Sequence, residues 1–124
     1  MNRYVLSLGS NLPDGTLKIR EAFQWISKEF QSPSFSEIYS TPAKNGDGTM
    51  YFNAVSVFSA DTPADELKLI LKAYELTHGR TSEARSKGLV PIDLDLVIVN
   101  NEIVRRSDYD EEYFQIGYRQ IKKD

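Results

Sequence analysis

The stretch "PIDLDLVIV" at residues 91–99 combines the pattern of a buried strand with two acidic side chains. Side chains alternate between the two faces of a strand, so Asp93 and Asp95 are expected on one face, roughly 6–7 Å apart. The other face is expected to carry the apolar residues Leu94, Leu96 and Ile98. The stretch therefore predicts a strand with one face covered by helices and a second face that places two like charges side by side.

The chain before this strand predicts two helices. Apolar residues at intervals of four, three and four predict an amphipathic helix over residues 16–30. Thr62 as N-cap, Pro63 at the first helical position and acidic residues in the first turn predict a second helix, with Gly79 as its C-cap. Residues 80–91 are predicted to form a basic loop, and the last part of the chain shows no clear period.

Strands are expected at residues 4–8, 35–39, 51–58 and 93–99. The resulting order is βαββαβ, which predicts an α+β, ferredoxin-like fold with a four-stranded antiparallel sheet and both helices on one face. The face that carries Asp93 and Asp95 is then expected to be open.

The composition indicates an ordinary globular chain, expected to form a single domain over residues 1–124. Its 124 residues are 40% apolar and 27% charged, and the net charge is −3 without a long run of Lys or Arg, which argues against a nucleic-acid partner. The absence of Cys excludes a disulfide framework and a Cys-ligated metal. The N-terminal stretch is expected to be a strand rather than a signal peptide, and no apolar run spans a membrane, so a cytoplasmic protein is predicted.

Paired carboxylates can share a proton, bind a divalent metal or simply be solvated. Loops at residues 9–11, 41–50 and 80–91 could converge on the face that carries the acidic pair. Mg²⁺ is commonly held by one or two carboxylates, with waters and substrate phosphates as further ligands. Because basic residues precede the pair, this pattern favours a metal-bound phosphate over an acid dyad.

Five motifs in this chain resemble, in order and spacing, the 6-hydroxymethyl-7,8-dihydropterin pyrophosphokinase family. They are "LSLGSNL" at 6–12, "YSTP" at 39–42, "YFNA" at 51–54, "YELTHGR" at 74–80 and "DLDLVIV" at 93–99. The resemblance covers about residues 3–104 and implies a divergent member with a short C-terminal part. It implies the folate-pathway reaction, in which a pyrophosphoryl group moves from ATP to a pterin alcohol with Mg²⁺ as cofactor.

The resemblance also implies roles for individual residues. Asp93 and Asp95 match the metal ligands and, together with Arg80, the catalytic positions. The nucleotide-side positions are Glu75, Arg80, Arg85 and Tyr109. The pterin-side positions are Gly9, Thr41, Pro42, Tyr51 and Asn53. From the residues alone, ordinary structural roles stay open. Gly9 can be a turn glycine, Thr41-Pro42 a strand end, Tyr51 a packing residue and Asn53 a polar residue at a strand edge. Glu75 and Arg80 can be charges at a helix end.

The chain departs from the family mainly on the phosphate side. The family has arginines at the positions of Ser82, Ser86, Val90 and Phe114, a histidine at Asp108, a tryptophan at Lys87 and an apolar residue at Lys44. Fewer arginine forks are therefore expected around the triphosphate. Two alternatives to an enzyme follow: a non-catalytic homologue that binds a pterin or nucleotide, and a ferredoxin-like module that dimerises through its sheet. A monomer or weak homodimer is expected.

Overall fold

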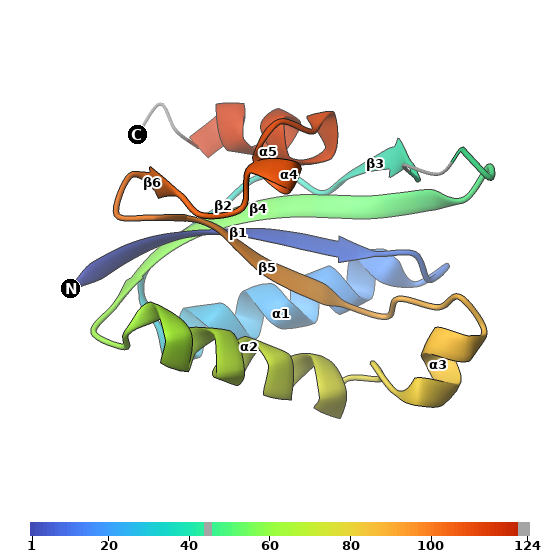
Figure 1. Ribbon diagram of the computed structural model, residues 1–124, viewed down its shortest axis with the longest axis horizontal. Coiled ribbons are helices and arrows are strands. Elements are labelled where there is room, and N and C mark those ends of the chain that lie inside the picture. Colours follow the sequence, from blue (N-terminus) through green and yellow to red (C-terminus); the bar gives the residue numbers. More distant parts are fainter. Residues whose placement is uncertain (44–45, 122–124) are drawn as a thin grey trace.

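The computed structural model describes residues 1–43 and 46–121, in which one antiparallel sheet carries helices on both faces (Figure 1). The strand order is β2-β4-β1-β5-β6, and β3 also pairs with β4. The elements are β1 (Asn2–Ser10), α1 (Gly15–Glu29), β2 (Gln31–Phe35), β3 (Tyr39–Pro42), β4 (Met50–Ala60), α2 (Ala64–Thr77), α3 (Ser82–Ser86), β5 (Asp93–Val99), β6 (Glu102–Ile103), α4 (Arg106–Tyr109) and α5 (Glu112–Ile121).

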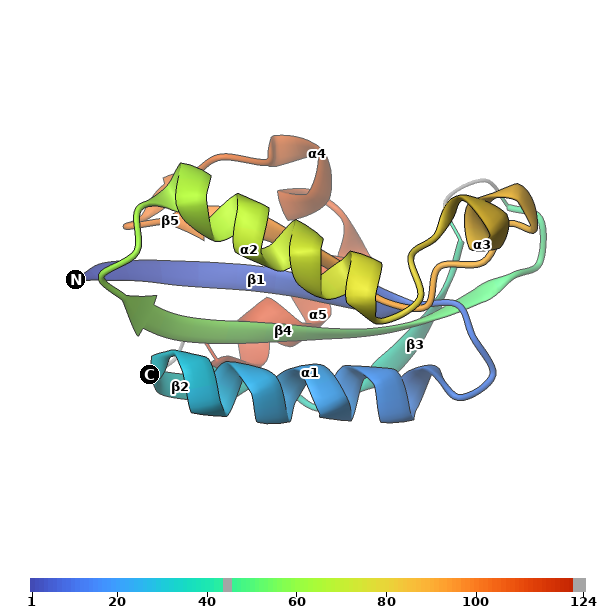
Figure 2. The same ribbon diagram turned by 90° about the horizontal axis from the view of Figure 1, so that it is seen from below.

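Helices α1 and α2 lie side by side across one face of the sheet (Figure 2), as the apolar periodicity predicts. Ile19, Ala22 and Ile26 supply the buried stripe of α1, and Leu67 and Leu71 supply that of α2. Together with the inward side chains of β1, β4 and β5, they form the first core. Within the described residues, no helix has the length and apolar character needed to cross a membrane.

The predicted strand count is wrong, because the described sheet has six strands rather than four. The strand expected at residues 35–39 is replaced by β2 and β3, which both pair with β4. Phe35 lies opposite Ser56 and Tyr39 lies opposite Asn53. The segment that joins β2 to β3 therefore has one residue more than the part of β4 that faces it. The Ser36 hydroxyl accepts a 2.8 Å hydrogen bond from the Val55 N–H and stabilises this break.

The second added strand, β6, follows a tight turn after β5. Asn100 and Asn101 both have positive φ, 49° and 72°, a conformation that asparagine tolerates well in tight turns. The turn brings Glu102 opposite Val99 and Ile103 opposite Ile98.

The prediction of a loop over residues 80–91 is wrong in part, because this segment contains α3. The Thr81 hydroxyl caps the N-terminus of this helix.

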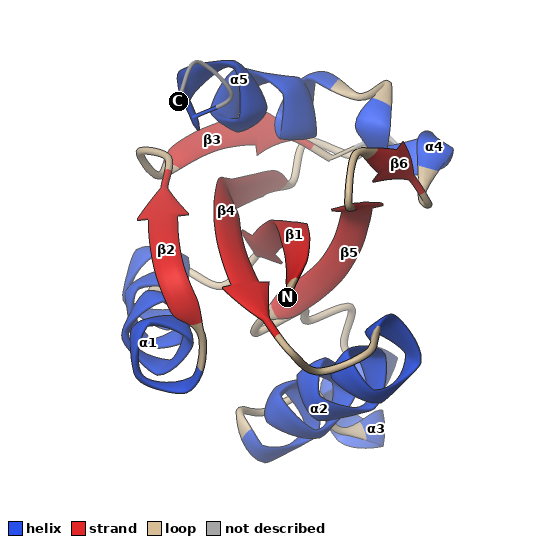
Figure 3. Cartoon of the chain, turned by 90° about the vertical axis from the view of Figure 1, so that its left-hand side faces the viewer, coloured by secondary structure: helices blue, strands red, loops and turns tan. Residues whose placement is uncertain are grey.

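The second face of the sheet is not open, because α5 packs across it (Figure 3). Phe114 and Ile121 of α5 join the inward residues Val5, Val55 and Val97 in a second core. Gly117 allows the close approach: a Cβ at this position would lie 2.7 Å from Val55 Cγ2 and 2.8 Å from the Tyr39 hydroxyl oxygen. The expectation of helices on only one face is therefore wrong.

A β-bulge divides β5. Leu96 pairs with Leu6 but Ile98 pairs with Val5, so Val97 is an extra residue in the strand. Beyond this point the alternation is reversed, and Ile98 joins Val97 in the second core. The expectation that Ile98 shares a face with Leu94 and Leu96 is wrong for this reason.

Candidate active site

Asp93 and Asp95 lie in the first half of β5 and contribute to the walls of two cavities. We call the first the loop cavity; it has a volume of about 450 Å³ and lies among β1, β3, β4 and β5. The second, the helix cavity, has about 510 Å³ and lies between α2, β5 and the segment that precedes α4. The side chains of Asp93 and Asp95 are 40% and 26% exposed, so the same two carboxylates are accessible to both spaces.

All the residues predicted on the pterin side line the loop cavity: Gly9, Thr41, Pro42, Tyr51 and Asn53. They come from three neighbouring strands, in which Gly9 lies opposite Asn53 and Thr41 opposite Tyr51. Pairing of the strands thus brings residues far apart in the sequence to one place. Lys44, a predicted departure in this slot, lies outside the described residues.

Asn53 is a buried polar residue of the loop cavity, and it is 4% exposed. Its amide nitrogen donates to the Thr41 hydroxyl at 2.8 Å and to the Tyr51 carbonyl at 3.2 Å. These bonds orient the amide oxygen toward Gly9, where it lies 3.8 Å from the position of an added Cβ. An amide held in this way presents a fixed acceptor to a ring N–H.

Asn11 fixes the end of the 80–91 segment beside the loop cavity. Its side-chain nitrogen donates to the Gly88 carbonyl at 2.9 Å, and its side-chain oxygen accepts from the Val90 N–H at 2.7 Å. Its backbone N–H also donates to the Val90 carbonyl at 3.0 Å. Both Asn11 and Gly88 line the loop cavity, so this clamp sets the position of one wall.

We expect Asn11→Ala to speed hydrogen exchange at Val90 by about tenfold, because the N–H loses its side-chain acceptor. Exchange measured by mass spectrometry or NMR should show the change in residues 86–91 and not in β1 or β4. Ser86→Ala, which removes a 2.7 Å hydroxyl bond to the Glu83 carbonyl within α3, is the matched control. Equal exchange at Val90 in Asn11→Ala and wild type would show that the clamp does not hold this segment.

Glu75 and Arg80 line the helix cavity and connect α2 to the acidic strand. Glu75 is buried, and its carboxylate accepts a 2.7 Å hydrogen bond from the Leu94 N–H. Arg80 donates to Asp93 at 3.0 Å and to the Ile92 carbonyl at 3.3 Å, while its Nη1 lies 3.9 Å from Glu75 Oε1. Burial raises the pKa of Glu75. Both residues therefore hold the start of β5 in place, whatever they contact in a ligand.

The electrostatic environment of Asp95 is unusual for a surface carboxylate. Burial, followed by the charge of Asp93, raises the pKa of Asp95 to about 8. Arg105 partly opposes this change, since its Nη2 lies 4.0 Å from Asp95 Oδ1. Two carboxylates thus lie side by side in the ligand-free site, and a bound cation would favour the charged form of Asp95.

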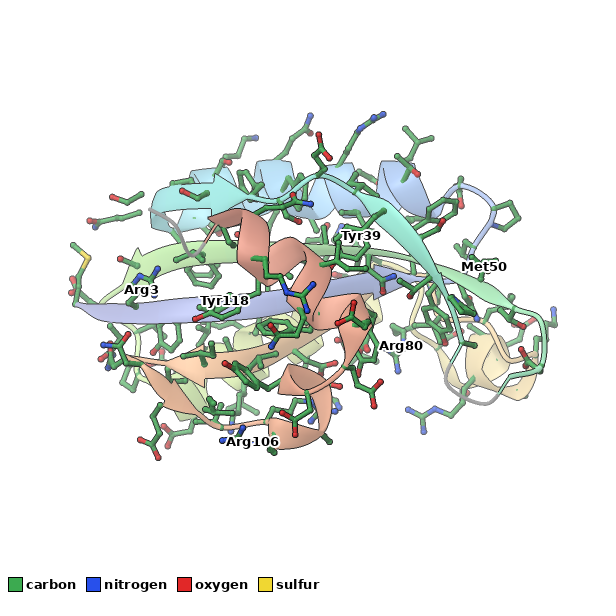
Figure 4. All side chains as sticks on the ribbon, turned by 90° about the horizontal axis from the view of Figure 1, so that it is seen from above. Arg3, Tyr39, Met50, Arg80, Arg106 and Tyr118 are labelled. Carbon is green, nitrogen blue, oxygen red and sulfur yellow. The ribbon has the colours of Figure 1, made fainter. Side chains whose placement is uncertain are left out.

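The sequence did not identify a second polar cluster beside this pair. Arg105 donates through Nε to the buried Asp108 carboxylate, which also accepts from the Tyr113 hydroxyl. Arg105 lines the helix cavity together with Lys68 and Lys72 of α2, whereas Asp108 and Tyr113 line the loop cavity. Tyr39 lies beside α5 (Figure 4) and bonds the Tyr113 carbonyl at 2.5 Å, which anchors this cluster to β3.

Two residues predicted on the nucleotide side lie apart from the cavities. Arg85 is exposed on α3 and lines neither space. The Tyr109 ring packs against Phe114 and Tyr118, with centroid distances of 5.9 and 6.1 Å, and the Arg106 guanidinium lies 5.2 Å above it. In this structure their side chains contribute to the surface and to the second core.

The chemistry of the acidic pair fits a hard divalent cation. Carboxylate oxygens are the ligands that Mg²⁺ prefers, and one or two of them with waters and phosphates make a common set. Burial and the neighbouring charge of Asp93, which raise the pKa of Asp95, disfavour its charged form, and a bound cation would oppose both effects. Across residues 1–43 and 46–121, no group of three or more His, Asp or Glu side chains is arranged to hold a metal ion.

One of the comparisons with known proteins agrees with the resemblance that the five motifs carry. A search of curated proteins finds no match. A protein-family model matches residues 5–122, which is nearly the whole chain of 124 residues. The chain belongs to the 7,8-dihydro-6-hydroxymethylpterin-pyrophosphokinase family.

Proposed function

We propose that this chain transfers the pyrophosphoryl group of ATP to the hydroxymethyl group of 6-hydroxymethyl-7,8-dihydropterin. Its family performs this step of folate biosynthesis and uses ATP and Mg²⁺. The observation that carries the proposal is the position of Asp93 and Asp95 in the walls of two cavities of different character. A pterin in the loop cavity and a nucleotide in the helix cavity would meet at these carboxylates.

In this proposal the loop cavity binds the pterin. The oriented Asn53 amide meets a ring N–H, and the Tyr51 ring and Gly9 leave a flat space beside it. Burial, followed by the charge of Asp93, raises the pKa of Tyr51, so its phenol stays a hydrogen-bond donor at neutral pH. Thr41 acts through its bond to Asn53 and sets the orientation of the amide.

The helix cavity would bind the nucleotide, with Asp93 and Asp95 as the residues that hold Mg²⁺. Bound Mg²⁺ neutralises phosphate charge. Arg80 keeps Asp93 in place through its 3.0 Å bond, and Glu75 fixes the backbone of Leu94 between the two aspartates. The protein thus mainly positions groups, as expected for phosphoryl transfer. In the reaction the pterin hydroxyl oxygen bonds the β-phosphorus, AMP leaves, and the hydroxyl proton is lost.

The experiment that tests the proposal is incubation of the protein with Mg²⁺-ATP and 6-hydroxymethyl-7,8-dihydropterin. Chromatography should show AMP and the pterin pyrophosphate in equal amounts, and neither should form with Asp95→Asn. Formation of ADP or phosphate without pterin product would contradict the proposal. Binding of both compounds without turnover would support the non-catalytic homologue instead.

One observation favours that second candidate. Apart from Arg80, the basic side chains of the 80–91 segment line neither cavity: Arg85 is exposed, and Lys87 pairs with Glu83 at 3.2 Å. Phosphate binding in the helix cavity thus depends on other cations. This is why the test measures turnover and binding separately.

We expect Gly9→Ala to weaken pterin binding by more than tenfold with little change in stability. An added Cβ would lie 3.8 Å from Asn53 Oδ1 and 3.9 Å from the Tyr51 ring, which is ordinary contact within the protein. The methyl group would instead occupy space that the ring needs. Calorimetric titration with the pterin measures the loss, and thermal unfolding provides the stability control. Unchanged affinity would show that the ring does not approach β1 at this point.

We also interpret the order β2-β4-β1-β5, with α1 and α2 on one face, as a ferredoxin-like core. In this interpretation β3, β6 and α3 to α5 are additions to the core. Two of them, β3 and the α4–α5 region, supply cavity walls through Thr41, Asp108 and Tyr113.

A further inference from the structure

Arg105 occupies the wall of the helix cavity opposite α2. It lies between β6 and α4, its side chain is 49% exposed, and its Nη2 is 4.0 Å from Asp95 Oδ1. Lys68 and Lys72, one turn apart on α2, line the same cavity. The cavity therefore combines three carboxylates, those of Glu75, Asp93 and Asp95, with three cationic side chains from α2 and the segment before α4, in addition to Arg80.

The position of Arg105 is set by a buried carboxylate. Asp108 is 7% exposed, and its two oxygens accept from Arg105 Nε and from the Tyr113 hydroxyl. Burying a carboxylate is costly unless it is paired and hydrogen-bonded, so this arrangement holds the guanidinium firmly. Because Nε makes the bond to Asp108, that bond does not use the terminal nitrogens, and Nη2 lies on the side of Asp95 at the wall of the cavity.

Arg105 differs in this respect from the other arginines near the site. Arg80 uses Nη1 to bond both Asp93 and the Ile92 carbonyl. Arg106, the next residue, is 65% exposed, pairs with Asp110 at 3.5 Å and lines neither cavity. Figure 4 shows Arg106 at the outer side of α4. Arg105 therefore has an Nε fixed by Asp108 and a terminal Nη2 near Asp95, at the wall of the helix cavity.

We propose that Arg105 binds the phosphate chain of the nucleotide through its terminal nitrogens, and that Asp108 and Tyr113 are positioning residues for it. This inference rests on the proposed function and adds to it the cation that replaces missing arginines of the family. An arginine fork bonds two phosphate oxygens at once, which a lysine cannot do. Arg105 then touches the substrate, while Asp108 and Tyr113 act through its geometry.

The test is calorimetric titration with two probes, Mg²⁺-ATP and inorganic tripolyphosphate in EDTA. Arg105→Gln should weaken binding of both by about 10- to 100-fold, because charge-assisted bonds to phosphate are lost. Arg105→Lys should lose most of this affinity as well, since one ammonium cannot bond Asp108 and the phosphate together. Arg106→Gln is the matched control and should change either affinity by less than about twofold. Pterin affinity should stay constant in all three variants.

A double-mutant cycle tests the positioning role. Tyr113→Phe should weaken Mg²⁺-ATP binding by about three- to tenfold in the wild-type background, because Asp108 loses a donor. In the Arg105→Gln background the same change should have almost no effect on ATP affinity. Equal effects of Tyr113→Phe in both backgrounds would show that Tyr113 does not act through Arg105, and would overturn this part of the proposal.

The outcomes separate this inference from the proposed function. Equal ATP affinities for Arg105→Gln and Arg106→Gln, in a wild-type protein that produces AMP and pterin pyrophosphate, would overturn the inference alone. A wild-type protein that binds neither probe and gives no product would overturn both. If Arg105→Gln unfolds, the ATP affinities of Arg105→Lys and Arg106→Lys are compared instead, because both changes retain the charge. A weaker affinity of Arg105→Lys alone supports the inference, and equal affinities overturn it.

Discussion

Replacing Asp95 by asparagine is expected to raise the melting temperature of the ligand-free protein, and to raise it more at pH 9 than at pH 5. Burial and the charge of Asp93 raise the pKa of Asp95 to about 8 in the folded protein, from its ordinary value of 3.8. The unfolded chain releases this proton near pH 4, whereas the folded chain retains it until about pH 8. Wild-type stability should therefore fall as the pH rises through this window.

The expected gain is large, because each unit of pKa shift corresponds to about 1.36 kcal/mol. Asp95 is partly exposed, so only a fraction of the full shift is expected to reach the free energy of unfolding. Thermal unfolding followed by circular dichroism at both pH values measures the effect. Asp61→Asn, at an 84% exposed carboxylate, is the control and should show no such pH dependence. Equal melting temperatures of Asp95→Asn and wild type at pH 9 would refute this account of Asp95.

Asp95→Asn also tests whether the acidic pair binds Mg²⁺. Mg²⁺ added at pH 9 should raise the melting temperature of the wild type, since a bound cation stabilises the folded state by mass action. It should have little effect on Asp95→Asn, which lacks one of the two carboxylates. A similar response of both proteins to Mg²⁺ would mean that the cation binds elsewhere.

Gly117→Ala is expected to be the most destabilising conservative change on α5. The added Cβ would lie 2.7 Å from Val55 Cγ2, 2.8 Å from the Tyr39 hydroxyl and 2.9 Å from Ser36 Oγ. All of these atoms belong to strand or strand-break residues packed beneath the helix, so α5 must move away. We expect a loss of about 1–3 kcal/mol in the free energy of unfolding, despite the higher helix propensity of alanine.

Urea unfolding measures this loss, and two further variants show its cause. Arg119→Ala, at an exposed residue paired with Glu112, should change stability by less than about 0.5 kcal/mol. Val55→Ala combined with Gly117→Ala should recover part of the loss, because the closest atom is removed. Additive effects in the double variant would indicate that the close approach of α5 is not the source of the instability.

The elements with a clear apolar period could be predicted from the sequence, and those that depend on tertiary contact could not. Helices α1 and α2 and strands β4 and β5 lie close to their predicted ranges. Helix α5 was missed although Phe114, Gly117 and Ile121 are spaced for one helical face. A glycine normally weakens a helix. Here it is required by a contact with β4 that becomes apparent only when the sheet is assembled.

In the candidate site, too, some residues could be predicted from the sequence and others depend on tertiary contact. The residues predicted on the pterin side belong to linear motifs on paired strands, so the sequence was sufficient to predict a set of residues that line one cavity. The Arg105–Asp108–Tyr113 cluster has no motif of its own, because its members meet only after α4 and α5 pack against the sheet. The single signal was Asp108, an acidic residue where the family has a histidine. Its burial gives that substitution a structural meaning.

The extra residue in β5 allows the two halves of this strand to change independently. In a regular strand, one inserted or deleted residue reverses the orientation of everything beyond it. Here Asp93 and Asp95 lie opposite Gly9 and Ser7, on one side of the irregularity, and the residues from Val97 onward lie on the other. Loss of Val97 would restore regular pairing and leave the acidic pair in place. Length variation among related chains is therefore expected to be tolerated at this point, and not between the two aspartates.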